Sequence, residues 1–155
     1  MLWNETSPWQ VNMIGAAEAA ARSLGFESVG LRDADQFESI FAKVRAVGFD
    51  AAIALPDANT FNCRKRLADP ALQYRVPLLH LEGAVDALMA YATDLNALFS
   101  RAASYADRLM KGATVGELPV EQPTTFRLVF NARTAKALGL AVPQSILARA
   151  DEVIE

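Results

Sequence analysis

The sequence AAIALPDANT at residues 51–60 decides the fold. Its first five residues are small and apolar without alternation, which is typical of a strand buried on both faces of a parallel sheet. The turn at residues 56–60 begins a helix that we predict to run to Tyr74, with a kink at Pro70. A second apolar run at residues 76–81 predicts the next strand.

The same alternation continues toward the N-terminus. Leu2-Trp3 is predicted to be the end of a strand. A helix follows that begins at Ser7 and Pro8, with Gln10 closing a capping box, and ends at Gly25. A further strand and helix are predicted at residues 26–31 and 33–48, the helix capped by Asp33 and Gln36, with core residues at Phe37, Ile40, Phe41 and Val44. This order predicts a parallel sheet with helices on both faces.

The pattern changes after Leu81. We predict a short strand at 88–91, a long helix from Asp94 to Gly112, and an extended stretch at 118–123. A strand at 126–130 and two short helices at 132–138 and 143–150 complete the prediction. We therefore expect one α/β domain over residues 1–155, a Rossmann-like three-layer α/β/α lobe from which a strand–helix segment at 86–118 protrudes.

Composition excludes several classes of function. The chain has 155 residues, 52% of them hydrophobic, and a net charge of −3, so intrinsic disorder and a basic nucleic-acid-binding surface are not expected. One cysteine and one histidine exclude cysteine-rich zinc sites and sites with two imidazoles. Phosphate-binding glycine loops and nucleophile elbows are missing from the sequence. We expect a protein that is not an enzyme and has no metal and no cofactor.

Four stretches of the C-terminal half carry a resemblance to a known family. They are RAASYADRLMKG at 101–112, LPVEQPT at 118–124, TAKALGL at 134–140 and LARADEVI at 147–154. Together they closely resemble the end of the ABC-transporter substrate-binding proteins whose better-known relatives bind aromatic amino acids. Leu2-Trp3-Asn4 and Leu55-Pro56-Asp57 look like the second lobe of the same family, so the resemblance covers the C-terminal half of a family member.

The resemblance implies a type I periplasmic binding protein, in which two Rossmann-like lobes close on a ligand at a hinge. It implies a non-catalytic function, the binding of an amino-acid-like solute for an ABC permease in the periplasm. The sequence departs from the family at residues 82–87, which lack the usual glycine pair, and this puts ordinary ligand binding in doubt. The stretch Met1–Asn4 has no features of a secretory signal, so a native start at Met1 would predict a cytoplasmic protein.

Two loops at predicted strand ends carry the candidate ligand-binding residues. Ligands of parallel sheets gather beyond the carboxyl ends of the strands, where helix N-termini offer free N–H groups. Hydroxyl and amide groups there suit a carboxylate, and Asp57 suits an ammonium group. The candidates are Asn4, Thr6, Ser7, Asp57, Asn59 and Thr60, with His80 from the strand at 76–81. The alternative is that the loop residues only cap helices and that His80 is an ordinary packed strand residue.

The helix at 94–112 has an apolar stripe at helical spacing, which in the family would be buried in the first lobe. Leaving its four large side chains in water forfeits about 1.5–3 kcal/mol each. We therefore expect a homodimer through Leu95, Leu98, Phe99, Ala102, Tyr105 and Leu109. This leaves a second hypothesis, a truncated stand-alone relative that is a structural or regulatory homodimer without ligand binding. A third is an input domain of a larger receptor.

Overall fold

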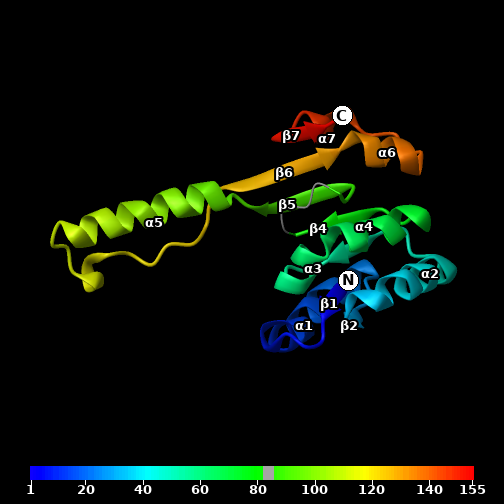
Figure 1. Cartoon of the computed structure of the whole chain (residues 1–155), viewed down its shortest axis with the longest axis horizontal. Coiled ribbons are helices and arrows are strands. Elements are labelled where there is room, and N and C mark those ends of the chain that lie inside the picture. The colour runs from blue at the N-terminus through cyan, green and yellow to red at the C-terminus, as the bar shows by residue number, and fades with distance from the viewer. Residues whose placement is uncertain (82–85) are drawn as a thin grey trace.

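The computed structural model describes residues 1–81 and 86–155. One seven-stranded sheet runs through the molecule in the order β2-β1-β3-β4-β5-β6-β7, flanked by helices (Figure 1). Its strands are β1 (Leu2–Asn4), β2 (Val29–Leu31), β3 (Ala52–Ala54), β4 (Leu78–His80), β5 (Met89–Thr93), β6 (Phe126–Asn131) and β7 (Glu152–Ile154). The α-helices are α1 (Pro8–Ala21), α2 (Phe37–Val47), α3 (Ala58–Asn62), α4 (Arg64–Gln73), α5 (Leu95–Met110), α6 (Ala132–Leu138) and α7 (Gln144–Leu147).

The connections between the strands follow the predicted order. Strands β1 to β5 pair in parallel, as do β6 and β7. The chain moves one way along the sheet from β1 to β2 and the other way from β2 to β3, so right-handed crossovers place α1 and α2 on opposite faces. The expected α/β architecture with helices on both faces is confirmed.

The core lies between the sheet and one layer of helices. Leu2, Ala54 and Leu78 point from three neighbouring strands toward that layer, and Phe41 of α2 and Leu67 of α4 are fully buried against them. The alanines of β3 bring the helices close, which explains why that strand is a run of small residues without polar alternation.

Several predicted elements differ in the structure. Ser7 is the N-cap of α1 and Pro8 its first residue, but the capping box with Gln10 is wrong, because the Ser7 side chain makes no capping bond. The helix predicted from residue 57 to Tyr74 is interrupted at Cys63, and Pro70 lies inside α4. The capping box of Asp33 is confirmed.

Two features of the C-terminal part were not predicted. Strand β6 pairs antiparallel with β5, and residues 152–154, for which no element was predicted, form the edge strand β7. The helix expected over 143–150 is the single turn α7. These departures share a cause, since strand direction and edge pairing depend on contacts distant in sequence.

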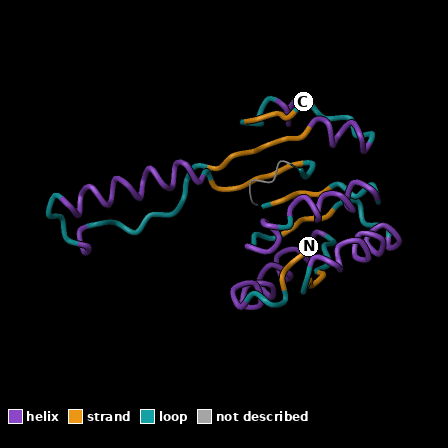
Figure 2. The backbone as a smooth tube through the Cα atoms, in the orientation of Figure 1, coloured by secondary structure: helices purple, strands orange, loops and turns teal. Residues whose placement is uncertain are grey.

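The segment from Asp94 to Thr125, called the arm below, extends away from the sheet (Figure 1). It consists of α5 and a return segment that runs back alongside the helix, mostly without regular structure (Figure 2). Tyr105 donates a hydrogen bond to the Pro119 carbonyl at 2.8 Å, and Arg101 forms an ion pair with Glu121. No residue of α5 is buried. In the described part of the chain, no helix is long and apolar enough to cross a membrane.

We expect Gln10→Leu to destabilise the fold. Gln10 is 1% exposed, accepts a hydrogen bond from the Asn4 N–H, and donates one to the Pro56 carbonyl at 2.7 Å. Leucine has a similar volume but leaves both backbone groups unpaired, at about 1–3 kcal/mol for each group. Urea denaturation gives the loss in unfolding free energy, with exposed Gln73→Leu as the control. Equal stability of the two variants would contradict this role.

The arm should loosen at acid pH. The Arg101 guanidinium, hydrogen-bonded to Glu121, holds the pKa of that carboxyl below its usual value of 4.5. The ion pair is therefore present at neutral pH and is lost as the pH falls through the lowered pKa. Heteronuclear NOE values of residues 118–125 should fall in Glu121→Gln at neutral pH, and in the unmodified chain once the pH falls below the lowered pKa of Glu121. A return segment equally ordered in Glu121→Gln and in the control Glu38→Gln would rule this out.

Candidate functional site

The candidate site lies at the carboxyl ends of β1 and β3. These neighbouring strands lead into helices on opposite faces of the sheet, and ligands of such sheets bind at the point where the direction of winding reverses. The carboxyl ends of these strands and the segments that follow them, as far as the first turn of α3, carry six of the seven predicted residues. The structure brings four of them, Asn4, Thr6, Asp57 and Asn59, into one hydrogen-bonded cluster.

Asn4 and Asp57 form the centre of this cluster. The Asn4 Nδ2 donates to the Asp57 Oδ1 at 2.8 Å, and the same oxygen accepts the Asn59 N–H at 2.9 Å. Asn4 is 4% exposed, whereas Asp57 is half-buried. Among the described residues, none donates a hydrogen bond to the other carboxylate oxygen of Asp57. Asp57 therefore caps α3 with one oxygen and can accept a ligand hydrogen bond with the other.

Thr6 is held on the opposite side of Asn4. Its N–H and its hydroxyl both donate to the Asn4 Oδ1, at 2.9 and 2.7 Å. Ser7 follows as the half-buried N-cap of α1, and its side chain makes no capping bond. The first turn of this 14-residue helix thus lies next to the Asn4–Asp57 pair. A helix N-terminus of this kind attracts an anionic group such as a carboxylate.

Thr60 and Asn59 are placed differently although they are adjacent. Thr60 is 2% exposed, and its hydroxyl donates to the Asp57 carbonyl at 2.9 Å, so its proton is used within the fold. Asn59 is exposed. Both line a hollow of about 210 Å³ that also includes Asn4, Leu31, Arg32, Asp33, Ala34, Phe37 and Cys63. This hollow has room for a small polar group beside the cluster.

His80 is the last residue of β4 rather than a loop residue. It is fully buried on β4, in register with Ala54 of β3 and Ala90 of β5. Its side chain lies on the same face of β4 as Leu78 and is covered by the fold rather than displayed at the surface. The loop that follows, with the altered glycine pair, includes residues 82–85, which lie outside the described residues.

The sequence prediction did not assign the roles that Gln10, Glu5 and Arg32 have at this edge. Gln10, read as a helix cap, is the buried link between Asn4 and Pro56. Glu5 pairs with Arg32 at 2.8 Å, and its side chain fills the space where a Cβ of Gly30 would lie. A lone glycine in a predicted strand signals a close approach, which is the one hint that the sequence offered.

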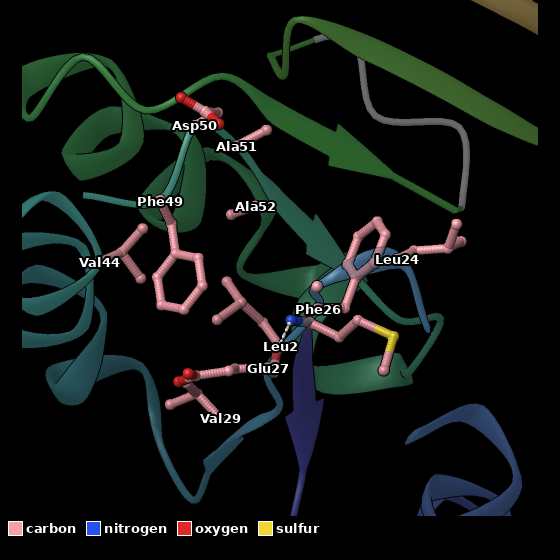
Figure 3. A pocket seen from close by; sticks show the side chains of 12 residues that line it. Leu2, Leu24, Phe26, Glu27, Val29, Val44, Phe49, Asp50, Ala51 and Ala52 are labelled. Carbon is pink, nitrogen blue, oxygen red and sulfur yellow. Dashed lines mark hydrogen bonds between the residues drawn. The ribbon is translucent and has the colours of Figure 1, made fainter. Parts of the chain in front are cut away.

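A second hollow lies at the opposite, amino edge of the sheet (Figure 3). Its volume is about 200 Å³, and apolar side chains dominate its wall, with Val44 and Phe49 facing Leu24 and Phe26 across Leu2. None of the predicted site residues lies there. It lacks the buried polar groups that fix the orientation of a polar ligand, so the carboxyl edge remains the candidate site.

The cluster suits recognition rather than reaction. Its groups are amides, hydroxyls, backbone N–H groups and one half-buried carboxylate, which can bind a carboxylate and an ammonium together. Within the described ranges, no group of three or more His, Cys, Asp or Glu side chains could hold a metal ion.

Comparison with solved structures gives the same fold. The chain is similar to a conserved domain protein from Vibrio cholerae, with 21% identity and a TM-score of 0.81, over 98% of this chain and 53% of that one. An ABC domain from Streptococcus pneumoniae in complex with L-Trp matches with 20% identity and a TM-score of 0.78, over 99% and 55%. A ligand-free, open substrate-binding protein with adhesive properties from Clostridium difficile matches with 18% identity and a TM-score of 0.75, over 99% and 52%.

This chain therefore spans about half the length of the structures that it matches. No curated protein matches it by sequence. A family model described as ABC transporter substrate binding protein matches residues 6–154, which is nearly the whole chain. Proteins of this family bind solutes for transport and are not enzymes. The chain belongs to the ABC transporter substrate-binding protein family.

Proposed function

We propose that this chain binds a small amino-acid-like solute at the carboxyl edge of its sheet, as the solute-binding part of an ABC importer. The observation that carries the proposal is the Asn4–Asp57 cluster, which joins residues from two loops beside the N-terminus of α1. Asp57 binds the ammonium group of the solute. Ser7 and the Asn59 side chain bind its carboxylate, whereas Thr6 and Thr60 hold the two loops in place.

Membership of the ABC transporter substrate-binding protein family supports a permease partner and a periplasmic location. An ABC permease receives the solute, and the protein works in the periplasm, where importers collect their substrates. The L-Trp bound by the similar Streptococcus pneumoniae domain favours an amino acid as the class of solute. A hollow beside the cluster, formed by Pro56, Phe61, Leu81, Ala92, Thr93, Leu95 and Leu98, has room for an apolar side chain.

Asp57→Asn separates charge recognition from folding. An amide at residue 57 still accepts from the Asn4 Nδ2 and the Asn59 N–H, so the loop keeps its shape while its negative charge is lost. We expect the affinity for amino acids to fall at least about tenfold, because a hydrogen bond to a charged group contributes about 1.5–3 kcal/mol. Isothermal titration calorimetry with a panel of the twenty amino acids measures this loss.

The matched control is Asp94→Asn, which alters the N-cap of α5, away from the cluster. It should leave the affinity unchanged. If Asp57→Asn binds the same amino acids as tightly as the unmodified chain, Asp57 does not hold the ammonium group. If no member of the panel binds to the unmodified chain, amino-acid binding by this chain is refuted.

The alternative is a stand-alone structural or regulatory homodimer that binds no solute. It is favoured by the exposed apolar stripe of α5. In both functions we propose a homodimer through the stripe of Leu95, Leu98, Phe99, Ala102, Tyr105 and Leu109. A dimer that binds none of the twenty amino acids would support the alternative over the solute-binding function.

A further inference from the structure

The loop that joins β1 to α1 is tied to the segments on both sides of β1. Strand β1 lies between β2 and β3 in the sheet. On the β3 side, the Asn4 side chain donates a hydrogen bond to Asp57. On the β2 side, the next residue, Glu5, forms an ion pair with Arg32. Two consecutive residues therefore hold the loop in opposite directions along the sheet.

Glu5 contacts the β2 side at three points. Its N–H donates to the Leu31 carbonyl at 2.9 Å, which extends the pairing of β1 with β2 by one residue. Its carboxylate accepts a hydrogen bond from the Arg32 Nε at 2.8 Å, and its side chain lies against Gly30. The side chain of Arg32 is 73% exposed and that of Glu5 35%, so the ion pair alone contributes little. The close contact over Gly30 adds to the restraint.

Gly30 leaves room for the Glu5 side chain. A Cβ added at residue 30 would overlap the Cγ, Cδ and Oε1 atoms of Glu5, which are its three nearest atoms. The φ angle of Gly30 is not positive, so an alanine can adopt its backbone conformation. Because the Glu5 side chain is flexible, an alanine at residue 30 displaces it without breaking the sheet. Gly30→Ala therefore removes the contact of Glu5 with β2 while Glu5 itself is kept.

We propose that Glu5, seated over Gly30 and paired with Arg32, is a positioning residue that holds Ser7 in place for the solute. This inference rests on the function proposed above, in which Ser7 binds the carboxylate of the solute. Ser7 follows Glu5 by two residues, and its side chain makes no capping bond, so the position of its hydroxyl depends on the backbone that leads to it. Glu5 does not contact the solute and acts through the backbone of residues 5–7.

Restraint of this segment favours binding for two reasons. A loop that is ordered before the solute arrives loses less conformational entropy when the solute binds. The Arg32 guanidinium also offsets the charge of Glu5, which otherwise lies two residues from a group proposed to receive a carboxylate. Glu5 therefore helps to order the site while Arg32 limits its repulsion of the solute.

Amide hydrogen exchange of the full 155-residue chain, followed by NMR, tests the positioning without a ligand. The Thr6 N–H, which donates to the Asn4 Oδ1, reports the order of the loop. Its exchange rate should rise at least about threefold in Glu5→Ala and to the same extent in Gly30→Ala, because either change removes the same contact. The controls Glu38→Ala and Gly116→Ala, at exposed positions outside the loop, should leave the rate unchanged. An unchanged rate in Glu5→Ala would overturn the proposal.

A double variant separates positioning by Glu5 from a general weakening of β2. If Gly30→Ala acts by displacing the Glu5 side chain, it should have no further effect on the Thr6 exchange rate in a Glu5→Ala background. Additive effects would mean that the alanine disturbs β2 by itself, and would overturn the role assigned to Gly30. Glu5→Gln keeps an acceptor for the Arg32 Nε and should restore most of the protection that Glu5→Ala loses.

Calorimetric titration with the twenty amino acids connects the loop to solute binding. For each amino acid that the unmodified chain binds, Glu5→Ala and Gly30→Ala should raise the dissociation constant at least about threefold, and the two control variants should not. Unchanged affinity in Glu5→Ala would overturn the positioning role and leave the solute-binding function standing. If the unmodified chain binds none of the twenty, the solute-binding function fails and the positioning role fails with it, whatever the exchange rates show about the loop.

Discussion

The arrangement of the carboxyl edge depends on one buried amide. Gln10 reaches from α1 to the Asn4 N–H at the end of β1 and to the Pro56 carbonyl after β3. Buried backbone groups must be paired, and at strand ends the ladder no longer pairs them. The Gln10 side chain supplies both partners at once. It thereby fixes the two loops that carry Asn4 and Asp57 at a distance where these side chains bond to each other.

The residues that shape the edge include those proposed to contact the solute. Asp57 uses one carboxylate oxygen for Asn4 and for the α3 cap, and Thr60 uses its hydroxyl proton on the Asp57 carbonyl. Within one residue, some polar atoms are therefore used by the fold while others are left for the proposed solute. These hydrogen bonds hold the side chains in place before a solute binds, so that binding costs less side-chain conformational entropy.

The arm presents the opposite situation, a well-formed element with little of the chain around it. Its helix is capped by Asp94 and braced by Arg101 and Tyr105, yet none of its residues is buried. The chain covers about half of each similar structure, and the arm extends away from its own sheet. Exposed apolar side chains gathered along one helix are typical of an interaction surface.

The sequence by itself determined the alternation of strands and helices, the family, and the loops at the carboxyl edge. These follow from local patterns: small apolar runs, N-caps and αL glycines such as Gly25 and Gly48 act within a few residues. Only the tertiary structure decided the antiparallel pairing of β6, the edge strand β7, the role of Gln10, and the burial of His80. Each of these depends on contacts between segments distant in sequence. Which partner a strand meets, or whether a glutamine turns to its own helix or to a loop 46 residues away, is settled only when the layers pack.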